Sequence, residues 1–327
     1  MESYLMKKTT CIGGLIAMIF VAGWVCRQPL SGQAPRSGLV AQKQHLVLTY
    51  VANAGALVAS GESKVLIDGL FDKPNPEYRA PAPEILDKMM KGAAPFDDVD
   101  LVIVTHNHPD HFDAGVALRY LEARPESVLV APSDAVEAMR RAAADWTKLG
   151  RRVVALDIKV GEQTKRDVAG IPVTAFRTLH SGDRESPMNL MYLFELGGRR
   201  VFHEGDSNGK PEVYQGFGLG SAPVDLALVH YWFPLDPNCA RWLQEVLKPG
   251  HIALTHLPIR LEGDAPGKID MVRQYYKDIF LLMPGMPSKI LQKNRGGPES
   301  PFVKSAWSTQ KSFKSLNRMN SLKGRKQ

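Results

Sequence analysis

Six consecutive residues contain four side chains that bind metal ions well, and this cluster limits the fold more than any other part of the sequence. It reads His106-Asn107-His108-Pro109-Asp110-His111. The apolar run 101–105 before it predicts a short strand, and 114–123 after it has the spacing of a helix. Imidazole nitrogens and carboxylate oxygens are ligands for zinc, iron or manganese, whereas a solvated polar loop would not need this spacing. We therefore predict a metal site in the loop between a strand and a helix.

The rest of the chain alternates between short apolar runs and segments of helical periodicity. With 327 residues, of which 44% are hydrophobic, it can form one large domain or two ordinary ones. Mixed strands and helices of this kind indicate sheets covered by helices. The predicted strands are 46–52, 56–60, 64–68, 101–105, 171–176, 190–196, 199–203, 225–230 and 251–255. The predicted helices are 81–91, 114–123, 134–149, 238–247 and 268–281.

The histidine cluster resembles the signature of the metallo-β-lactamase superfold, and further motifs occur in the expected order over roughly residues 46–285. The resemblance implies an α+β protein with a four-layer αββα sandwich, in which two β-sheets pack face to face and helices cover the outside. We expect this catalytic domain to occupy residues 45–290 and to place its ligands along one edge of the sandwich.

The resemblance also implies a site with two divalent metal ions, zinc in the first instance, with iron or manganese as alternatives. Asp68, in Val65-Leu66-Ile67-Asp68-Gly69, resembles the aspartate that supports a metal-bound histidine from behind. The expected ligands of the first ion are His106, His108 and His180, those of the second are Asp110, His111 and His256, and Asp206 would bridge both. Seven ligands exceed what one tetrahedral ion can use.

What the resemblance implies about chemistry is a hydrolase in which a metal-bridging hydroxide attacks an ester-type bond, either a phosphodiester or a lactone or carboxylic ester. Asp110 would be a catalytic residue that orients the attacking oxygen.

True β-lactamases generally lack the counterparts of His111 and Asp206, so the chain resembles bacterial relatives of ascorbate-6-phosphate lactonase and of the N-acylphosphatidylethanolamine-hydrolysing phospholipase D. Asn53 departs from that pattern, because lactonase-like members often have histidine there. The expected substrate is a small-molecule or lipid-like ester.

His230 allows two interpretations. It follows a predicted strand and precedes Tyr231-Trp232-Phe233. It is therefore either a second catalytic residue, acting as a general acid or a hydrogen-bond donor to the substrate, or a histidine that packs in an aromatic cluster. We expect His203 to be structural. Two other classes compete with hydrolysis: an iron-dependent redox or oxygenase member of the superfold, and a protein that binds metal without catalysis.

The N-terminal segment is typical of an exported protein. Basic residues at positions 7 and 8 precede an uncharged stretch, 9–26, which predicts a signal peptide, or alternatively a membrane anchor or a buried helix. Residues 27–44 read as a linker. We expect the body of the protein in the periplasm or on the outer face of the cytoplasmic membrane. The sequence does not indicate an oligomeric state.

The C-terminal segment contains most of the excess positive charge. Residues 291–327 include nine Lys and Arg and one acid, a net charge of +8, so the formal +7 of the whole chain leaves about −1 for residues 1–290. A near-neutral body does not favour a specific nucleic-acid surface. The segment has few apolar residues, which predicts a disordered tail, with attraction to a membrane surface as the alternative.

Overall fold

The computed structural model describes residues 44–73, 76–264, 267, 270, 273, 276 and 278–292. They belong to one compact unit, Gln42–Gln327, while the other unit, Met1–Ala41, lies outside the described residues. The predicted signal peptide or anchor, nearly all of the linker and almost all of the basic tail therefore also lie outside them. In the part that is described, no helix combines the length and the apolar character needed to cross a bilayer.

The first sheet has seven strands in the order β14-β1-β2-β3-β4-β5-β6. Strands β3 to β6 are parallel to one another, so their carboxyl ends meet at one edge of the sheet. The bounds are β1 Leu46–Ala52, β2 Gly55–Ser60, β3 Ser63–Ile67, β4 Leu101–Ile103, β5 Val128–Pro132, β6 Val153–Leu156 and β14 Lys289–Leu291.

The second sheet also has seven strands, in the order β13-β12-β11-β10-β9-β8-β7. Here β10 to β13 are parallel, and their carboxyl ends likewise share an edge. The bounds are β7 Gln163–Val168, β8 Ile171–His180, β9 Arg184–Leu196, β10 Arg199–His203, β11 Leu226–His230, β12 His251–Thr255 and β13 Ile279–Leu281.

The main hydrophobic core lies between the two sheets, because one cluster of buried side chains takes residues from both. In β3, Val65 and Ile67 belong to this inner cluster, while Leu66 between them belongs to a second cluster on the outer face. The same alternation in β11 places Leu226 inside and Ala227 outside. Strands buried on both faces explain why these segments read as continuous apolar runs.

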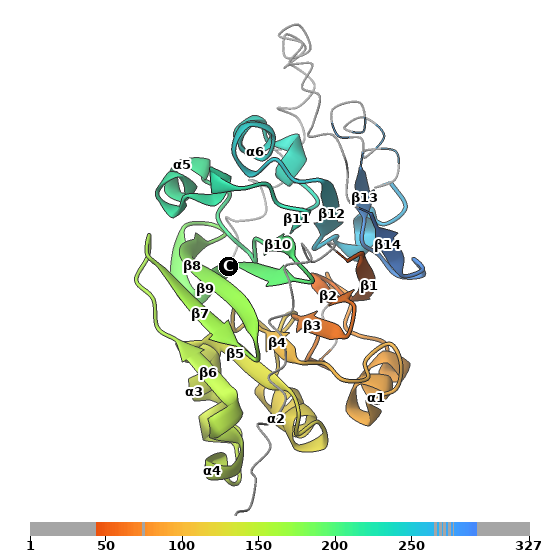
Figure 1. Cartoon of the computed structure of the whole chain (residues 1–327), viewed down its shortest axis with the longest axis vertical. Coiled ribbons are helices and arrows are strands. Elements are labelled where there is room, and N and C mark those ends of the chain that lie inside the picture. The colour runs from red at the N-terminus through yellow and green to blue at the C-terminus, as the bar shows by residue number, and fades with distance from the viewer. Residues whose placement is uncertain are drawn as a thin grey trace, which may run out of the picture. The chain divides into compact units, whose positions relative to one another are not determined.

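Helices cover both outer faces, which confirms the predicted four-layer αββα sandwich (Figure 1). The helices over the first sheet are α1 Pro83–Lys91, α2 Ala114–Ala123, α3 Ser133–Ala142 and α4 Trp146–Leu149. Those over the second are α5 Pro211–Tyr214 and α6 Pro237–Trp242, and α6 runs on into the π-helical turn η5 Leu243–Leu247. Helix α2 begins directly after the histidine cluster, and the carboxylate of Asp113 caps it by accepting from the amide of Val116 at 3.0 Å.

Several predicted elements differ in detail. The single helix predicted for 134–149 is two helices, because Ala143 leaves α3 in an extended conformation and Asp145 caps α4. The helix predicted for 268–281 is wrong at its end, since Ile279–Leu281 pairs with β12 as strand β13; most of its earlier part lies outside the described residues. Strands β5, β6, β7 and β14 were not predicted. Strand β7 is mostly exposed and polar, so it lacks an apolar pattern.

Candidate metal centre

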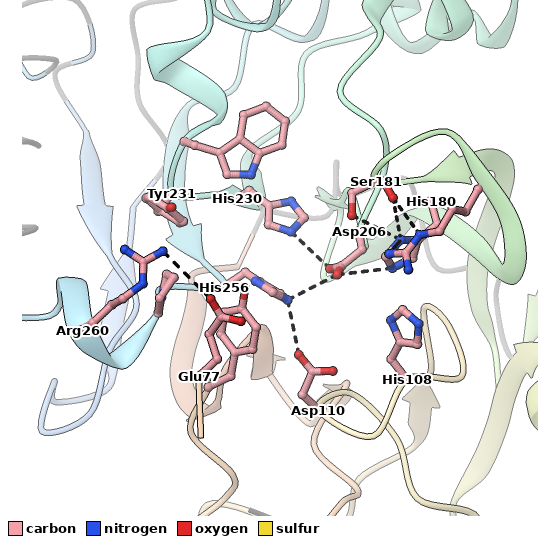
Figure 2. A pocket seen from close by; sticks show the side chains of 14 residues that line it. Glu77, His108, Asp110, His180, Ser181, Asp206, His230, Tyr231, His256 and Arg260 are labelled. Atoms are coloured by element: carbon pink, nitrogen blue, oxygen red, sulfur yellow. Dashed lines mark hydrogen bonds and ion pairs between the residues drawn. The ribbon is translucent and has the colours of Figure 1, made fainter. Parts of the chain in front are cut away.

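All seven expected metal ligands lie at one edge of the sandwich, where the parallel strands of both sheets end. The cluster of four follows β4, His180 ends β8, and Asp206 and His256 follow β10 and β12. Figure 2 shows His180, His108, Asp110 and His256 around the carboxylate of Asp206. The sandwich therefore brings together residues that are up to 150 positions apart, from His106 to His256.

The first group comprises His106, His108, His180 and Asp206, whose ligand atoms all lie within 4.8 Å of one another. The Nε2 atom of His106 is 3.1 Å from Nδ1 of His108, so these two rings present different nitrogens to the same point. The Nε2 atom of His180 completes this side at 3.5 Å from Asp206 Oδ2.

The second group comprises Asp110, His111 and His256. The carboxylate Oδ2 of Asp110 lies 3.8 Å from Nε2 of His111 and 3.5 Å from Nε2 of His256. Burial favours protonation of Asp110, but the nearby rings of His256 and His111 lower its pKa to about 2. The carboxylate is therefore ionised and able to act as a ligand at neutral pH.

Asp206 lies between the two groups. Its Oδ2 is 3.7 Å from His106 Nε2 on one side and 3.3 Å from His256 Nε2 on the other. Its Oδ1 is 3.4 Å from His111 Nε2. Burial favours the neutral acid, but His256 and His111 hold the pKa of Asp206 well below its usual range. One ionised carboxylate thus faces ligands of both groups, as a bridging residue must.

Buried nitrogen and oxygen atoms without hydrogen-bond partners indicate that this donor set fits divalent metal ions. Within the described part of the chain, His180 Nε2, His256 Nε2 and Asp206 Oδ1 are buried and form no hydrogen bond. A buried polar atom without a partner is unfavourable in a folded protein. All three point into the two ligand groups, where coordination would satisfy them. Burial and the charge of His111 also lower the pKa of His106 well below its usual range, which leaves its ring neutral and able to coordinate.

Asp68 lies behind the second group and contacts His111, in the position that the resemblance implies. Its Oδ2 accepts a hydrogen bond from His111 Nδ1 at 2.9 Å, which turns His111 Nε2 toward the ligand cluster. Thr105 fixes the carboxylate through its backbone amide at 2.8 Å and its hydroxyl at 2.6 Å. Asp68 and His256 both have positive φ angles, 42° and 57°, which are uncommon for residues other than glycine. Such backbone strain is concentrated at functional sites.

Two asparagines that sequence reasoning did not assign to the site hold its aspartates. Asn53 Nδ2 donates to Asp110 Oδ2 at 3.1 Å, in the place where the resemblance led us to expect a histidine. Asn189 Oδ1 accepts from the backbone amide of Asp206 at 2.9 Å. Gly205 lets them approach, because a Cβ at this residue, whose φ is +59°, would lie 2.7 Å from Asn189 Oδ1.

His230 lies at the site and is paired with a buried glutamate that the sequence analysis missed. Its Nε2 is 3.2 Å from Asp206 Oδ1. Glu204 Oε1 accepts hydrogen bonds from the backbone amide of His230 at 2.6 Å and from its Nδ1. The ring also stacks on Trp232, with 5.6 Å between centroids, so aromatic packing is present, and a catalytic role of His230 stays a prediction. The only clue to Glu204 in the sequence is its position two residues before Asp206.

The electrostatics of this pair favour a charged imidazolium. Burial lowers the pKa of His230, but the carboxylates of Glu204 and Asp206 outweigh burial and raise it to about 10. His203, by contrast, bonds to backbone groups, with Nε2 3.2 Å from the carbonyl oxygen of Ala54 and Nδ1 accepting from the amide of Gly205. These bonds indicate a structural role for His203.

An open pocket of about 370 Å³ leads to the ligand groups. Aromatic side chains and two arginines form its walls around the metal ligands (Figure 2). The residues that line it besides the metal ligands and His230 are Glu77, Tyr78, Ser181, Arg184, Tyr231, Trp232, Pro258 and Arg260.

Comparison with known proteins agrees with this geometry. Residues 63–260 match the model of the beta-lactamase superfamily domain. A "UPF0173 metal-dependent hydrolase" from Thermus thermophilus is 26% identical over 227 residues, which cover 66% of this chain and 87% of the relative. A protein of the same description from Saccharolobus solfataricus is 28% identical over 204 residues, 62% of this chain and 79% of the relative.

Solved structures share the fold at low sequence identity. Igni18, described as a novel metallo hydrolase from Ignicoccus hospitalis, has a TM-score of 0.51 at 17% identity, and the match covers 76% of this chain and 100% of the Igni18 chain. The metallo-beta-lactamase fold protein YhfI from Bacillus subtilis has a TM-score of 0.50 at 17% identity, over 73% of this chain and 96% of its own. Nearness to the ascorbate-6-phosphate lactonase and phospholipase D branches stays a prediction.

Proposed function

Since this chain belongs to the metallo-β-lactamase superfamily, we propose that it is a metal-dependent hydrolase that holds two divalent metal ions and cleaves an ester-type bond. The bond is a phosphodiester or a lactone or carboxylic ester. Curated relatives described as metal-dependent hydrolases support the general activity. Zinc suits the histidine-rich donor set best, and iron or manganese could occupy the same ligands.

The observation that supports this proposal most is the position of Asp206 between two groups of ligands. Atoms from His106, His108 and His180 would hold one ion, and atoms from Asp110, His111 and His256 the other, with Asp206 shared. Bound divalent ions would supply a water-derived nucleophile near neutral pH and would polarise the bond to be broken.

The protein's own side chains would position that chemistry and move the proton. Asp110 reaches the edge of the pocket as an ionised carboxylate, and Asn53 fixes its orientation. His230 lines the same pocket, and the buried carboxylate of Glu204 beside its Nδ1 favours the protonated ring, so it can donate a proton to the oxygen of the leaving group. Glu204 accepts from Nδ1 of His230, which leaves Nε2 on the side of the pocket, 3.2 Å from Asp206 Oδ1.

Cys239, the cysteine within the described residues, does not supply a nucleophile. Cys239 is buried, and its thiol donates to the carbonyl oxygen of Gly209 at 3.2 Å. Burial raises the pKa of the Cys239 thiol far above its usual range, so the thiolate is not formed at neutral pH. This agrees with a mechanism that needs no covalent intermediate on the protein.

Asp110→Asn tests the proposal, because asparagine keeps the shape and removes the charge. We expect the metal-loaded variant to fold normally and its turnover of phosphodiesters or lactones to fall by about 10²-fold or more. Metal analysis and circular dichroism accompany the kinetics. Asp87→Asn, an exposed change on α1, is the matched control and should keep wild-type activity.

Three outcomes would contradict the proposal. Normal turnover by Asp110→Asn with full metal content would show that this carboxylate has no catalytic role. Redox-active iron without hydrolysis would favour the oxygenase class. Bound metal with no turnover of either ester class would favour a metal-binding protein without catalysis.

A further inference from the structure

Two arginines line the pocket, and they differ in how their charge is balanced. Arg260 lies 3.9 Å from the carboxylate of Glu77. Arg184, at the start of β9, has no carboxylate partner among the described residues. Its neighbour Asp183 instead binds Lys210 at 2.6 Å. Arg184 is therefore a cation at the pocket whose charge is not neutralised by any carboxylate among the described residues.

The contacts of Arg184 tie it to a metal ligand. Its Nε donates to the carbonyl oxygen of Ser181 at 3.1 Å, and its Nη2 lies 2.9 Å from Nδ1 of His180. The same Nδ1 is 3.2 Å from the carbonyl oxygen of Ser181. Arg184 can only donate to this nitrogen, and the carbonyl can only accept from it. His180 Nδ1 can therefore satisfy one of these two partners but not both.

The ligand role of His180 decides between the two partners. Its Nε2 faces Asp206 and the first ligand group, and a nitrogen that coordinates a metal ion carries no proton. The neutral ring then has its proton on Nδ1, which donates to the carbonyl oxygen of Ser181. With a metal ion on Nε2 of His180, Arg184 Nη2 would lose this acceptor, while its Nε can keep the bond to Ser181. One edge of the guanidinium would then be free beside the first ligand group.

We propose that the substrate is an anionic ester and that Arg184 binds its oxyanion, a carboxylate or a phosphate. A guanidinium presents paired donors that match the two oxygens of such a group. Figure 2 shows His180 on one side of Asp206 and Tyr231 and Arg260 on the other. The oxyanion would bind on the His180 side, and an apolar part of the substrate would contact Tyr231 and Trp232. This substrate class rests on the proposed hydrolase function.

The test measures binding as well as turnover, with the metal-loaded full chain. Inorganic phosphate and acetate are titrated calorimetrically into wild type, Arg184→Gln, Arg184→Lys and the control Arg166→Gln, an exposed arginine on β7. We expect Arg184→Gln to weaken binding of at least one anion by about 10-fold or more at unchanged metal content, because a charged hydrogen bond is lost. Arg184→Lys should retain part of the affinity, and the control should match wild type. The anion whose affinity for Arg184→Gln falls more shows whether Arg184 prefers a phosphate or a carboxylate.

A matched pair of esters provides the kinetic arm. The two substrates are the same ester with a free and with a methylated acidic group. Arg184→Gln should lower kcat/KM for the anionic member by about 10-fold or more and leave that of the neutral member unchanged. Equal effects on both esters, or unchanged anion binding, would overturn the assignment of Arg184. Turnover of neutral esters alone would refute the anionic substrate while the hydrolase stands. Arg184-dependent anion binding without any ester turnover would refute the hydrolase instead.

Discussion

Replacing Glu204 by glutamine tests whether His230 acts as a proton donor. Glu204 is only 1% exposed, and one of its oxygens accepts both the amide and the Nδ1 proton of His230. Glutamine keeps an oxygen of the same reach but removes the negative charge. The variant therefore weakens the pairing without removing the ring that faces the substrate, which makes Glu204 a positioning residue.

The size of the effect follows from these two hydrogen bonds. A hydrogen bond to a charged group contributes about 1.5–3 kcal/mol and a neutral one about 0.5–1.5 kcal/mol. Losing the charge therefore costs about 1–1.5 kcal/mol for each bond, and about 2–3 kcal/mol for both. If this whole difference is added to the activation free energy, the rate falls by about 30- to 150-fold. The other oxygen of Glu204 is buried without a hydrogen bond in the described structure, so an amide there also lowers the free energy of unfolding by about 1–3 kcal/mol.

The assay combines a pH–rate profile with metal analysis and thermal unfolding. A donor must be protonated, and removing the charge of Glu204 lowers the pKa of His230. We therefore expect the alkaline limb of the profile to move to lower pH in Glu204→Gln, at unchanged metal content. Glu195→Gln, an exposed change on β9, is the control. His230→Ala and the double variant should be about equally slow, because the two residues act as one unit. A wild-type rate and profile for Glu204→Gln would refute the reasoning.

Two predictions concern the metal ions directly. Burial lowers the pKa of His111, but Asp206, Asp68 and Asp110 outweigh burial and raise it to about 9, so the metal-free ring is protonated at pH 7. Metal binding should then release this proton, and the affinity for the metal should rise with pH up to about 9. Calorimetry of metal binding at pH 7 in buffers of different ionisation enthalpy measures the proton release. If no proton is released, this prediction is wrong. Asp68→Asn removes the charge that accepts from His111 Nδ1, and should weaken metal affinity by about 10- to 100-fold in a chelator competition. Full metal retention by that variant would show that Asp68 only supports the backbone.

The sequence predicted the sandwich and the candidate ligands through a resemblance that rests on short local motifs. A run such as Leu226–His230 is apolar on both faces, and such runs occur in strands buried from both sides. The cluster from His106 to His111 is short, and its spacing is itself a motif. The exposed strand β7 has no apolar pattern and was missed, whereas β13, the short apolar run Ile279–Leu281, was placed inside a predicted helix.

Only the tertiary structure decided which other residues belong to the site. In the sequence Asn53 is only a departure from the family pattern and Glu204 only a residue near Asp206, yet these two and Asn189 each bind a residue at the centre of the site from a different strand or loop. The same holds for Arg184, whose unbalanced charge is visible only when its contacts are known. The sequence by itself determined the types and the order of the candidate ligands, because coordination chemistry depends on residue type. The residues that orient those ligands are set by distances across the fold, which one-dimensional spacing does not contain.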